Sequence, residues 1–532
     1  MPRRASRGRL AGLLATILVA VAGCAVGPSA RPVIVVRDGT TDTPTTSGRS
    51  APLPPLDEPA ASSITWSDCG AATRARLGDT AGSSSLPFHC GQITGVLDAP
   101  NNPGVGEVAL SVLKAGTGPI PLVVVNDVGG DPGTLYAARL ASQLPEPMLT
   151  VFSLVGMDRR GTGASDPLQC APQSARTRIV GFDPADSQLD ALLDAARVAS
   201  QECVLAMDDR LTALDSWRTA GDLEQLRVEL GVGHLNAIGH GDGSRVLTAY
   251  ADRYAGHTGR FVLDGSPDPT LDATGLAKAT AAGAEAAFEA FAADCRTRGC
   301  ALGGNPKQEL LALVDQLRAH PMADHTGFEL TAGGALHAVL AGLATRAVWP
   351  ALADAIARAR AGDSGPLAQF VAPLLGLVDG ASPKPHLPGA GQGRVEPARL
   401  DAELTRCNDT LTRLPPEQIS SMVRDWSGSM PLFGGLFAQQ LLLCSPWPVP
   451  ASQLAAPSGR NAPPILVLST ASDPVTPEEG TARTARQLVN GLLVSWQGGG
   501  HGSLPRSPCA TAAAQHFLVD AQVPTDGTAC PP

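Results

Sequence analysis

The residues of this chain that could carry out chemistry lie at the ends of predicted strands. "VLSTASDPVTPEEG" places Asp473 after an apolar run, and "VSWQGGGHGS" places His501 after the next one. A carboxylate beside an imidazole is the pair that orients a histidine as a general base. Upstream, "NAIGHGDGSRV" puts Gly239, Gly241 and Gly243 between a short strand and a helix. The chain therefore offers a tight turn, an acid and a base, in that order.

The glycine turn has the spacing of a hydrolase nucleophile elbow, G-x-S-x-G, in the same strand–turn–helix context. The flanking positions of such an elbow have no room for a Cβ, and Gly239 and Gly243 meet that requirement. A register centred on Asp242 would put His240 at a flank, where it is far too large. The nucleophile position is therefore Gly241, which has no side chain.

Other groups could stand in for the missing nucleophile. Ser244 lies about one helical turn further on and is expected to cap or face its helix. Asp242 could polarise a water molecule towards a bound substrate. "GDSGP" at 362–366 resembles a serine-protease motif, but it lies in an Ala/Arg-rich helical stretch without a β-barrel pattern, so we interpret it as coincidence.

A dinucleotide site is a rival interpretation of the three glycines, with Asp264 at the end of the next strand binding a ribose. The third glycine comes one residue early for that fingerprint, and the unit follows several earlier strands. Asp473 and His501 would also go unexplained. We therefore expect no cofactor, and the cysteines lack metal-ligand spacing, so no metal is expected either.

Short β-type runs alternate with helical patterns over much of the chain, which indicates a parallel sheet with crossover helices. The later runs are almost continuously apolar, as in strands covered on both faces. The predicted strands are 91–97, 106–113, 120–126, 150–157, 234–238, 260–264, 464–469 and 491–496.

The alternation stops near residue 270 and returns at 464. The intervening residues are Ala-rich and helical, which is typical of a cap inserted between two strands of one sheet. The prediction is an α/β-hydrolase fold with a mainly helical cap between the strand near 260 and the strand near 464. Its parts are a first core segment 63–270, a cap 271–455, and a C-terminal core segment 456–532 that carries the acid and base.

Further motifs make a specific resemblance. "MDRRGTGASDPLQC" at 157–170 and "RFVLDGSPDP" at 260–269, with the elbow and the Asp473 and His501 stretches, resemble exported tripeptidyl-aminopeptidase-like serine peptidases, relatives of proline iminopeptidases. The resemblance covers roughly 63–530. It implies a serine hydrolase that releases short peptides from free N-termini, with Asp473 as acid, His501 as base and a cap that restricts access.

The departures from that family lie at the reacting centre. The family's nucleophilic serine falls on Gly241. The family's glycine-proline-glycine oxyanion loop reads "NDVGGDPG" at 126–133, which keeps Gly129 and Gly130 but gains Asp127 and Asp131. The expected oxyanion region, Gly129 and Gly130 with Asp242, thus contains carboxylates, which oppose the stabilisation of a developing oxyanion.

Loss of the nucleophile from a serine triad costs roughly 10⁶ in turnover. The sequence therefore favours a pseudo-hydrolase that binds a peptide or a small ester or amide ligand in a cleft between core and cap. The alternative is an active secreted peptidase or esterase that uses a non-standard nucleophile or water. The retained Asp473 and His501 favour the alternative, whereas the altered elbow and loop favour the pseudo-hydrolase.

The N-terminus predicts export. Four arginines precede the apolar run 10–22, which is too short to span a bilayer, and "VAGC" ends it at Cys24. We expect a lipoprotein signal peptide, 1–23, lipidation of Cys24 and a disordered tether, 24–62. The mature protein would be anchored by lipid to the outer face of a bacterial plasma membrane. The alternative is an ordinary signal peptide in which Cys24 occurs by chance.

The other cysteines are even in number, which in an exported chain suggests disulfides. The order along the chain suggests neighbour pairing, without proving it. The net charge of −10 gives no basic surface, so nucleic acid is not an expected partner. The candidate pairs are Cys69–Cys90, Cys170–Cys203, Cys295–Cys300, Cys407–Cys444 and Cys509–Cys530.

Overall fold

The computed structural model describes one unit of the chain, within Ser50–Pro532. The predicted signal peptide, Cys24 and most of the predicted tether lie outside the described residues. Those residues are 52–78, 85–98, 103–104, 106–324, 328–377 and 397–532.

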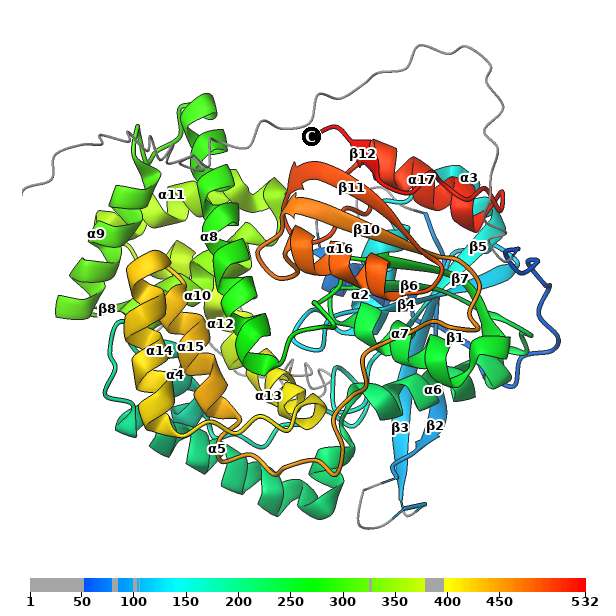
Figure 1. The fold of residues 1–532 in the computed structure, drawn as a ribbon, viewed down its shortest axis with the longest axis horizontal. Helices are drawn as coiled ribbons and strands as arrows, with labels where there is room; N and C mark the ends of the chain where they lie inside the picture. Colours follow the sequence, from blue (N-terminus) through cyan, green and yellow to red (C-terminus); the bar gives the residue numbers. More distant parts are fainter. Residues whose placement is uncertain (1–51, 79–84, 99–102, 105, 325–327, 378–396) are drawn as a thin grey trace, which may run out of the picture. The chain divides into compact units, whose positions relative to one another are not determined.

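The core is a ten-stranded sheet in the order β1-β2-β3-β5-β4-β6-β7-β10-β11-β12 (Figure 1). The first three pairings, up to β3 with β5, are antiparallel, and the remaining pairings are parallel. A mostly parallel sheet of this kind confirms the predicted fold class. The strands are β1 Ser67–Asp68, β2 Phe88–Val96, β3 Glu107–Ala115, β4 Ile120–Val125, β5 Phe152–Met157, β6 Leu235–His240, β7 Thr258–Asp264, β10 Ile465–Ser472, β11 Gly491–Gly499 and β12 Thr528–Cys530.

Helices cover both faces of the sheet. All residues of β4, β5, β6 and β7 are buried, which explains the apolar runs at the centres of these strands. On one face, the core cluster includes side chains of α6 Ser216–Leu230, α7 Gly243–Arg253 and α16 Glu478–Gln487. The other face packs against α1 Gly70–Leu77, α2 Gly133–Ala141, α3 Glu146–Val151 and α17 Pro508–Leu518.

A separate helical layer, the cap layer, lies beside the sheet (Figure 1). Its hydrophobic cluster joins the helices between β7 and β10 to two earlier helices, α4 and α5. The members are α4 Gln173–Gly181, α5 Asp190–Met207, α8 Ala273–Arg298, α9 Pro306–Ala319, α10 Ala332–Leu343, α11 Trp349–Arg360, α12 Gly365–Leu375, α13 Arg399–Leu404, α14 Pro416–Ser429 and α15 Gly434–Leu443. A short hairpin, β8 Met322–Ala323 with β9 Glu329–Leu330, and 3-10 helices η2 Asp208–Ala213, η3 Ala255–His257, η4 Arg346–Val348 and η5 Thr405–Asp409 complete the elements.

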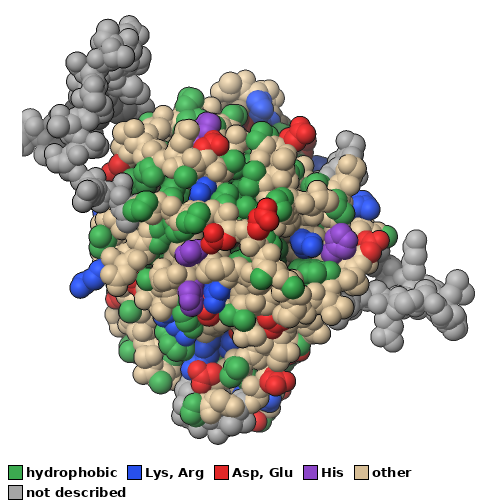
Figure 2. Space-filling model, turned by 90° about the vertical axis from the view of Figure 1, so that its right-hand side faces the viewer, with side chains coloured by type: hydrophobic (Ala, Val, Ile, Leu, Met, Phe, Trp, Pro, Cys, Tyr) green, Lys and Arg blue, Asp and Glu red, His purple; other side chains and the backbone are tan. Residues whose placement is uncertain are grey.

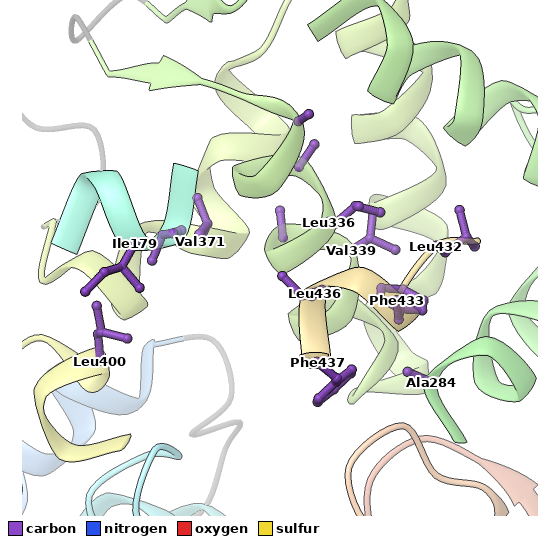
Figure 3. Packing of buried hydrophobic residues seen from close by; sticks show 14 of the residues in the cluster. Ile179, Ala284, Leu336, Val339, Val371, Leu400, Leu432, Phe433, Leu436 and Phe437 are labelled. Atoms are coloured by element: carbon purple, nitrogen blue, oxygen red, sulfur yellow. The ribbon is translucent and has the colours of Figure 1, made fainter. Parts of the chain in front are cut away.

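The cap layer therefore includes more of the chain than the expected segment 271–455. Ile179 of α4 lies beside Val371 of α12 and Leu400 of α13 (Figure 3). The expected core segment 63–270 thus contributes two helices to the cap layer. An amphipathic helix pattern shows that a helix has a buried face, but not which layer buries it, so the sequence could not make this assignment.

Five disulfides join the ten cysteines in the neighbour order suggested by the sequence. Cys509–Cys530 ties the first turn of α17 to β12, and Cys69–Cys90 ties the start of α1 to β2. Cys407–Cys444 lies within the cap layer, where it links η5 to the end of α15.

Among the described residues, no single helix is both long and apolar enough to cross a membrane. Two helices, Ala332–Leu343 and Arg346–Arg360, pass the length and composition test only together, and they meet at a 119° bend. Their apolar residues, including Leu336, Val339 and Ile356, are buried in the cap layer.

The face in Figure 2 mixes hydrophobic, acidic and basic side chains. Among the coloured residues of that face, basic side chains gather in one small group in the lower half, with acidic side chains beside it, and single basic and acidic side chains are interspersed elsewhere. This face is not the continuous basic surface that binds nucleic acids.

Candidate functional site

The elbow forms between β6 and α7 as the spacing predicts. Gly241 has a φ of +57°, a left-handed conformation that strains any residue with a Cβ. A Cβ on Gly243 would lie 2.2 Å from the Val125 carbonyl oxygen, and one on Gly239 would lie 2.8 Å from Ser244 Cα. The two outer glycines are therefore required by close backbone packing.

Asp473 and His501 come together at the carboxyl ends of β10 and β11. Asp473 lies in the loop after β10, and its Oδ2 is 3.0 Å from His501 Nδ1. Backbone N–H groups of Val475, Thr476 and Gly502 donate to the Asp473 carboxylate. Burial alone would raise the pKa of Asp473, but the charge and hydrogen bond of His501 and these N–H donors lower it. Asp473 is thus an ionised carboxylate that orients the imidazole.

The space of the missing nucleophile contains the carboxylate of Asp127. An ideal Cβ built on Gly241 would lie 2.2 Å from both Asp127 oxygens. On the other side, Asp127 Oδ2 lies 2.7 Å from His501 Nε2, the atom that would take a proton from a serine nucleophile. Asp127 comes from the loop after β4, not from the elbow. A carboxylate from a neighbouring loop has taken the contacts of an elbow side chain.

The oxyanion donors are also engaged within the protein. In α/β-hydrolases the two oxyanion donors are the backbone N–H of the residue after the nucleophile and a backbone N–H of the loop that corresponds here to 126–132. The Asp242 N–H donates to Asp127 Oδ1 at 2.7 Å, and the Val128 N–H donates to Asp242 Oδ1 at 3.1 Å. A tetrahedral intermediate would have to displace one of these carboxylates to reach either donor.

Gly129 and Gly130, the expected oxyanion glycines, lie in this loop with other contacts. The Gly130 N–H donates to the Asp127 carbonyl oxygen and closes a turn. A Cβ on Gly129 would lie 2.3 Å from Cγ of Glu403, which belongs to α13 of the cap layer. Gly129 thus allows the cap layer to approach the loop closely.

The electrostatics of the site hold His501 in its charged form. Burial alone would lower the pKa of His501, but the carboxylates of Asp473 and Asp127 raise it to about 10. Burial would likewise raise the pKa of Asp127, and the charge and hydrogen bond of His501 hold it far below its ordinary value. At neutral pH the group is an imidazolium between two carboxylates, and an imidazolium cannot act as a general base.

Charged groups of the cap layer and of the 157–170 motif surround the elbow. Asp242 accepts from Arg159 Nη1 at 2.6 Å and from Arg406 Nε at 3.1 Å. Arg399 of α13 pairs with Asp131 at 2.5 Å. Every carboxylate introduced around the elbow therefore has a cationic partner.

The "MDRRGTGASDPLQC" stretch acts as a support for the β4–α2 loop. Asp158 Oδ1 accepts from the Thr134 N–H at the start of α2, and Asp158 Oδ2 accepts from the Ala164 N–H. Arg160 makes a bidentate pair with Asp222 of α6. These bonds fix the backbone that presents Asp127.

The alternative catalytic groups have structural roles. Ser244 is fully buried, and its hydroxyl lies within hydrogen-bonding distance of the Gly239 and Gly265 carbonyl oxygens. Asp264 is buried and accepts from the N–H and hydroxyl of Ser503 and from the Leu504 N–H, so it is not presented to a ribose. Ser364 of "GDSGP" is buried immediately before α12.

His240 is a site residue that was not predicted from the sequence. Its ring stacks on Tyr136 with centroids 5.0 Å apart, and it lies 4.3 Å from the ring of His501. From the sequence, His240 was noted only as a side chain too large for the flank of a nucleophile elbow. Its position as the last residue of β6, beside the nucleophile position, was the signal that could have found it.

Comparison with known proteins agrees with this geometry. The model described as "alpha/beta hydrolase fold" matches residues 121–322, and the model described as "TAP-like protein" matches residues 430–530. The chain belongs to the TAP-like α/β-hydrolases. The two matches contain the elbow on one side and Asp473 and His501 on the other.

Named relatives of this TAP-like hydrolase cover most of its length. It is 26% identical over 466 residues to serine protease Hip1 of Mycobacterium tuberculosis, covering 83% of this chain and 87% of that protein. It is 27% identical over 501 residues to carboxylesterase B of the same species, covering 88% and 90%. It is 23% identical over 491 residues to tripeptidyl aminopeptidase of Streptomyces lividans, covering 88% and 87%.

Proposed function

We propose that this protein is a non-catalytic member of the TAP-like hydrolases, in which a carboxylate permanently fills the catalytic centre. The observation that carries the proposal is the position of Asp127. Its carboxylate lies against Gly241, bonds the Asp242 N–H and contacts His501.

Three separate requirements of serine hydrolysis fail together. Gly241 supplies no nucleophile, which alone costs roughly 10⁶ in turnover. The Asp242 N–H is already bonded, and loss of one oxyanion donor costs roughly 10²–10³. His501 is already protonated at neutral pH, because burial lowers its pKa but the neighbouring carboxylates raise that pKa to about 10.

The proposed ligand is a peptide or a small ester or amide held between core and cap layer. One support is the contact of the cap layer with the elbow region, where Arg406 of η5 bonds Asp242 and Glu403 of α13 packs on Gly129. The other is that the relatives include proteins named tripeptidyl aminopeptidase and carboxylesterase B. The proposed location is the outer face of the plasma membrane, with lipid on Cys24. This rests on the sequence pattern at 1–24, and labelling with a radioactive fatty acid, absent in Cys24→Ala, tests it.

One observation favours a second function, a hydrolase with Asp127 as its nucleophile. One oxygen of Asp127 lies on the Asp242 N–H and the other lies beside His501, as a carboxylate nucleophile requires. Attack of Asp127 on an ester or amide carbonyl would form a mixed anhydride with Asp127 and release the alcohol or amine, which takes its proton from His501. Hydrolysis of that anhydride to free Asp127 and an acid product would then need His501 to activate water. That step is opposed by the protonation of His501. Burial lowers the pKa of His501, but the two carboxylates beside it raise that pKa to about 10, so the ring already carries its proton at neutral pH.

The test is incubation of the purified chain with tripeptidyl and ester chromogenic substrates and a fluorophosphonate probe. The non-catalytic proposal predicts no turnover above a His501→Gln control and no labelled residue. Mass spectrometry of the protein after incubation with ester substrate detects any adduct. An adduct on Asp127, or turnover lost in both His501→Gln and Asp127→Asn, would establish the second function instead.

A further inference from the structure

We infer that Asp127, His240 and His501 form a binding site for a divalent transition-metal ion. One ligand atom from each residue can be chosen so that all three lie within 4.8 Å of one another, and all three residues are largely buried. They come from three different loops or strand ends, after β4, at the end of β6 and after β11. This site could not be predicted from the sequence, because Asp127 and His501 are 374 positions apart.

The spacing is close to what a metal ion needs. Metal–ligand bonds of about 2.0–2.2 Å at tetrahedral angles place ligand atoms about 3.3–3.5 Å apart. Asp127 Oδ2 is 2.7 Å from His501 Nε2 and 4.0 Å from His240 Nε2. The ligand atoms of the two histidines lie within 4.8 Å of one another. Shifts of about half to three-quarters of an ångström at each ligand would therefore form the site. The ion would replace the proton on His501 Nε2, which is released when the metal binds.

The surroundings of both histidines supply an independent argument. A metal-bound histidine usually donates its second ring N–H to a carboxylate, which fixes the ring orientation. His501 Nδ1 lies 3.0 Å from Asp473, and His240 Nδ1 lies 3.5 Å from Asp264. His501 Nδ1 is thus bonded to a carboxylate, and His240 Nδ1 faces a carboxylate without reaching hydrogen-bond geometry.

His240 itself has no ordinary structural explanation. The side chain is 8% exposed, and its buried Nδ1 has no hydrogen-bond partner at bonding geometry among the described residues. A ligand on Nε2 would fix the tautomer with a proton on Nδ1, facing Asp264. Tyr136 on one side and Gly502, where a Cβ would lie 2.5 Å from His240 Cε1, hold the ring in place.

The donor set defines the chemical class of the ion. Two imidazoles and one carboxylate suit Zn²⁺, Co²⁺ or Fe²⁺ better than Mg²⁺ or Ca²⁺, which prefer oxygen ligands. Three carboxylates, those of Asp127, Asp264 and Asp473, surround the two rings and favour a dication. Gly241 makes room for the arrangement, because any side chain there would collide with Asp127.

The test is binding of Zn²⁺ and Co²⁺ to the purified full chain with its disulfides formed. We expect about one Zn²⁺ per chain after dialysis, and a Co²⁺ absorption spectrum of a four- or five-coordinate site. Asp127→Asn and His240→Gln should each weaken Zn²⁺ binding by about 100-fold or more, and Asp264→Asn by about 10–100-fold. His257→Gln, a half-exposed histidine outside the site, is the matched control and should bind as wild type does.

Thermal unfolding of each variant without metal separates a lost site from a lost fold. Zn²⁺ should raise the melting temperature of wild type and of His257→Gln, but not of Asp127→Asn. Equal binding by wild type, Asp127→Asn and His240→Gln, or no binding by wild type, would overturn the site. Either result leaves the non-catalytic proposal standing, because that proposal is judged separately, by turnover of substrate and labelling by the probe, and both can be measured with a chelator present.

Discussion

Restoring the family's serine should fail unless Asp127 is removed at the same time. In Gly241→Ser the new Cβ would lie 2.2 Å from both Asp127 oxygens, and contacts under 3.0 Å essentially never occur. The backbone at +57° adds roughly 1–3 kcal/mol of strain for a residue with a Cβ. The collision adds roughly 1–3 kcal/mol more, typical of an overpacked site. We expect a destabilised protein without activity.

In the double variant Asp127→Gly/Gly241→Ser, the collision disappears and the Asp242 N–H is free for an oxyanion. Without Asp127, one of the two carboxylates that raise the pKa of His501 against the effect of burial is gone, so that pKa falls towards neutrality. The double variant should unfold at a higher denaturant concentration than the sum of the single effects predicts. A coupling of roughly 0.5–3 kcal/mol is typical of residues in contact.

The assays are urea unfolding, fluorophosphonate labelling and the burst of nitrophenol from a nitrophenyl ester. Labelling at position 241 is expected in the double variant only. The matched control is Asp131→Gly/Gly241→Ser, which removes a carboxylate of the same loop that pairs with Arg399 and not with His501. The reasoning is refuted if Gly241→Ser alone is as stable as wild type, or if the control is labelled as strongly as the double variant.

Three further predictions follow from buried contacts. Burial lowers the pKa of His501 but its carboxylate neighbours raise it from 6.5 to about 10, so its stabilising effect should be complete below pH 6.5 and lost as the pH rises through 10. Denaturant unfolding against pH should show this fall in wild type, and Asp127→Asn should flatten it. Ser244→Ala should lower the free energy of unfolding by about 1–2 kcal/mol, because its hydroxyl bonds buried carbonyls, and leave probe reactivity unchanged. Replacing Cys509 and Cys530 by serine should cost roughly 2–4 kcal/mol, and thiol titration of unfolded wild type should find that pair unreactive before reduction.

The sequence predicted the features that depend on local spacing. The elbow, Asp473 and His501 each lie within a few residues of a strand end, so the strand pattern placed them at one edge of the sheet. The role of Asp127 was not predictable in the same way, because it depends on how the β4–α2 loop meets the elbow in space. From the sequence, Asp127 was expected only as a carboxylate within the oxyanion loop, whereas in the structure it faces Gly241 and His501.

The retained acid and base take on a different meaning in this structure. From the sequence, Asp473 and His501 favoured an active enzyme, because a decaying site has no reason to keep them. In the structure His501 is the cation that holds the buried carboxylate of Asp127, and Asp473 holds His501. Removing one partner of such a buried pair typically costs 3–5 kcal/mol, since it leaves an unpaired charge.

Gly241 and Asp127 therefore depend on one another. A side chain at 241 would exclude the carboxylate, and loss of the carboxylate would leave the Asp242 N–H and His501 without their partner. Selection for the folded state alone then keeps Asp473, His501 and Asp127 together, whether or not any substrate is turned over. If this coupling is correct, His501→Gln should destabilise wild type by several kcal/mol but cost less in an Asp127→Asn background, where the amide no longer needs a cation. Equal costs in the two backgrounds would show that the acid and base are retained for another reason.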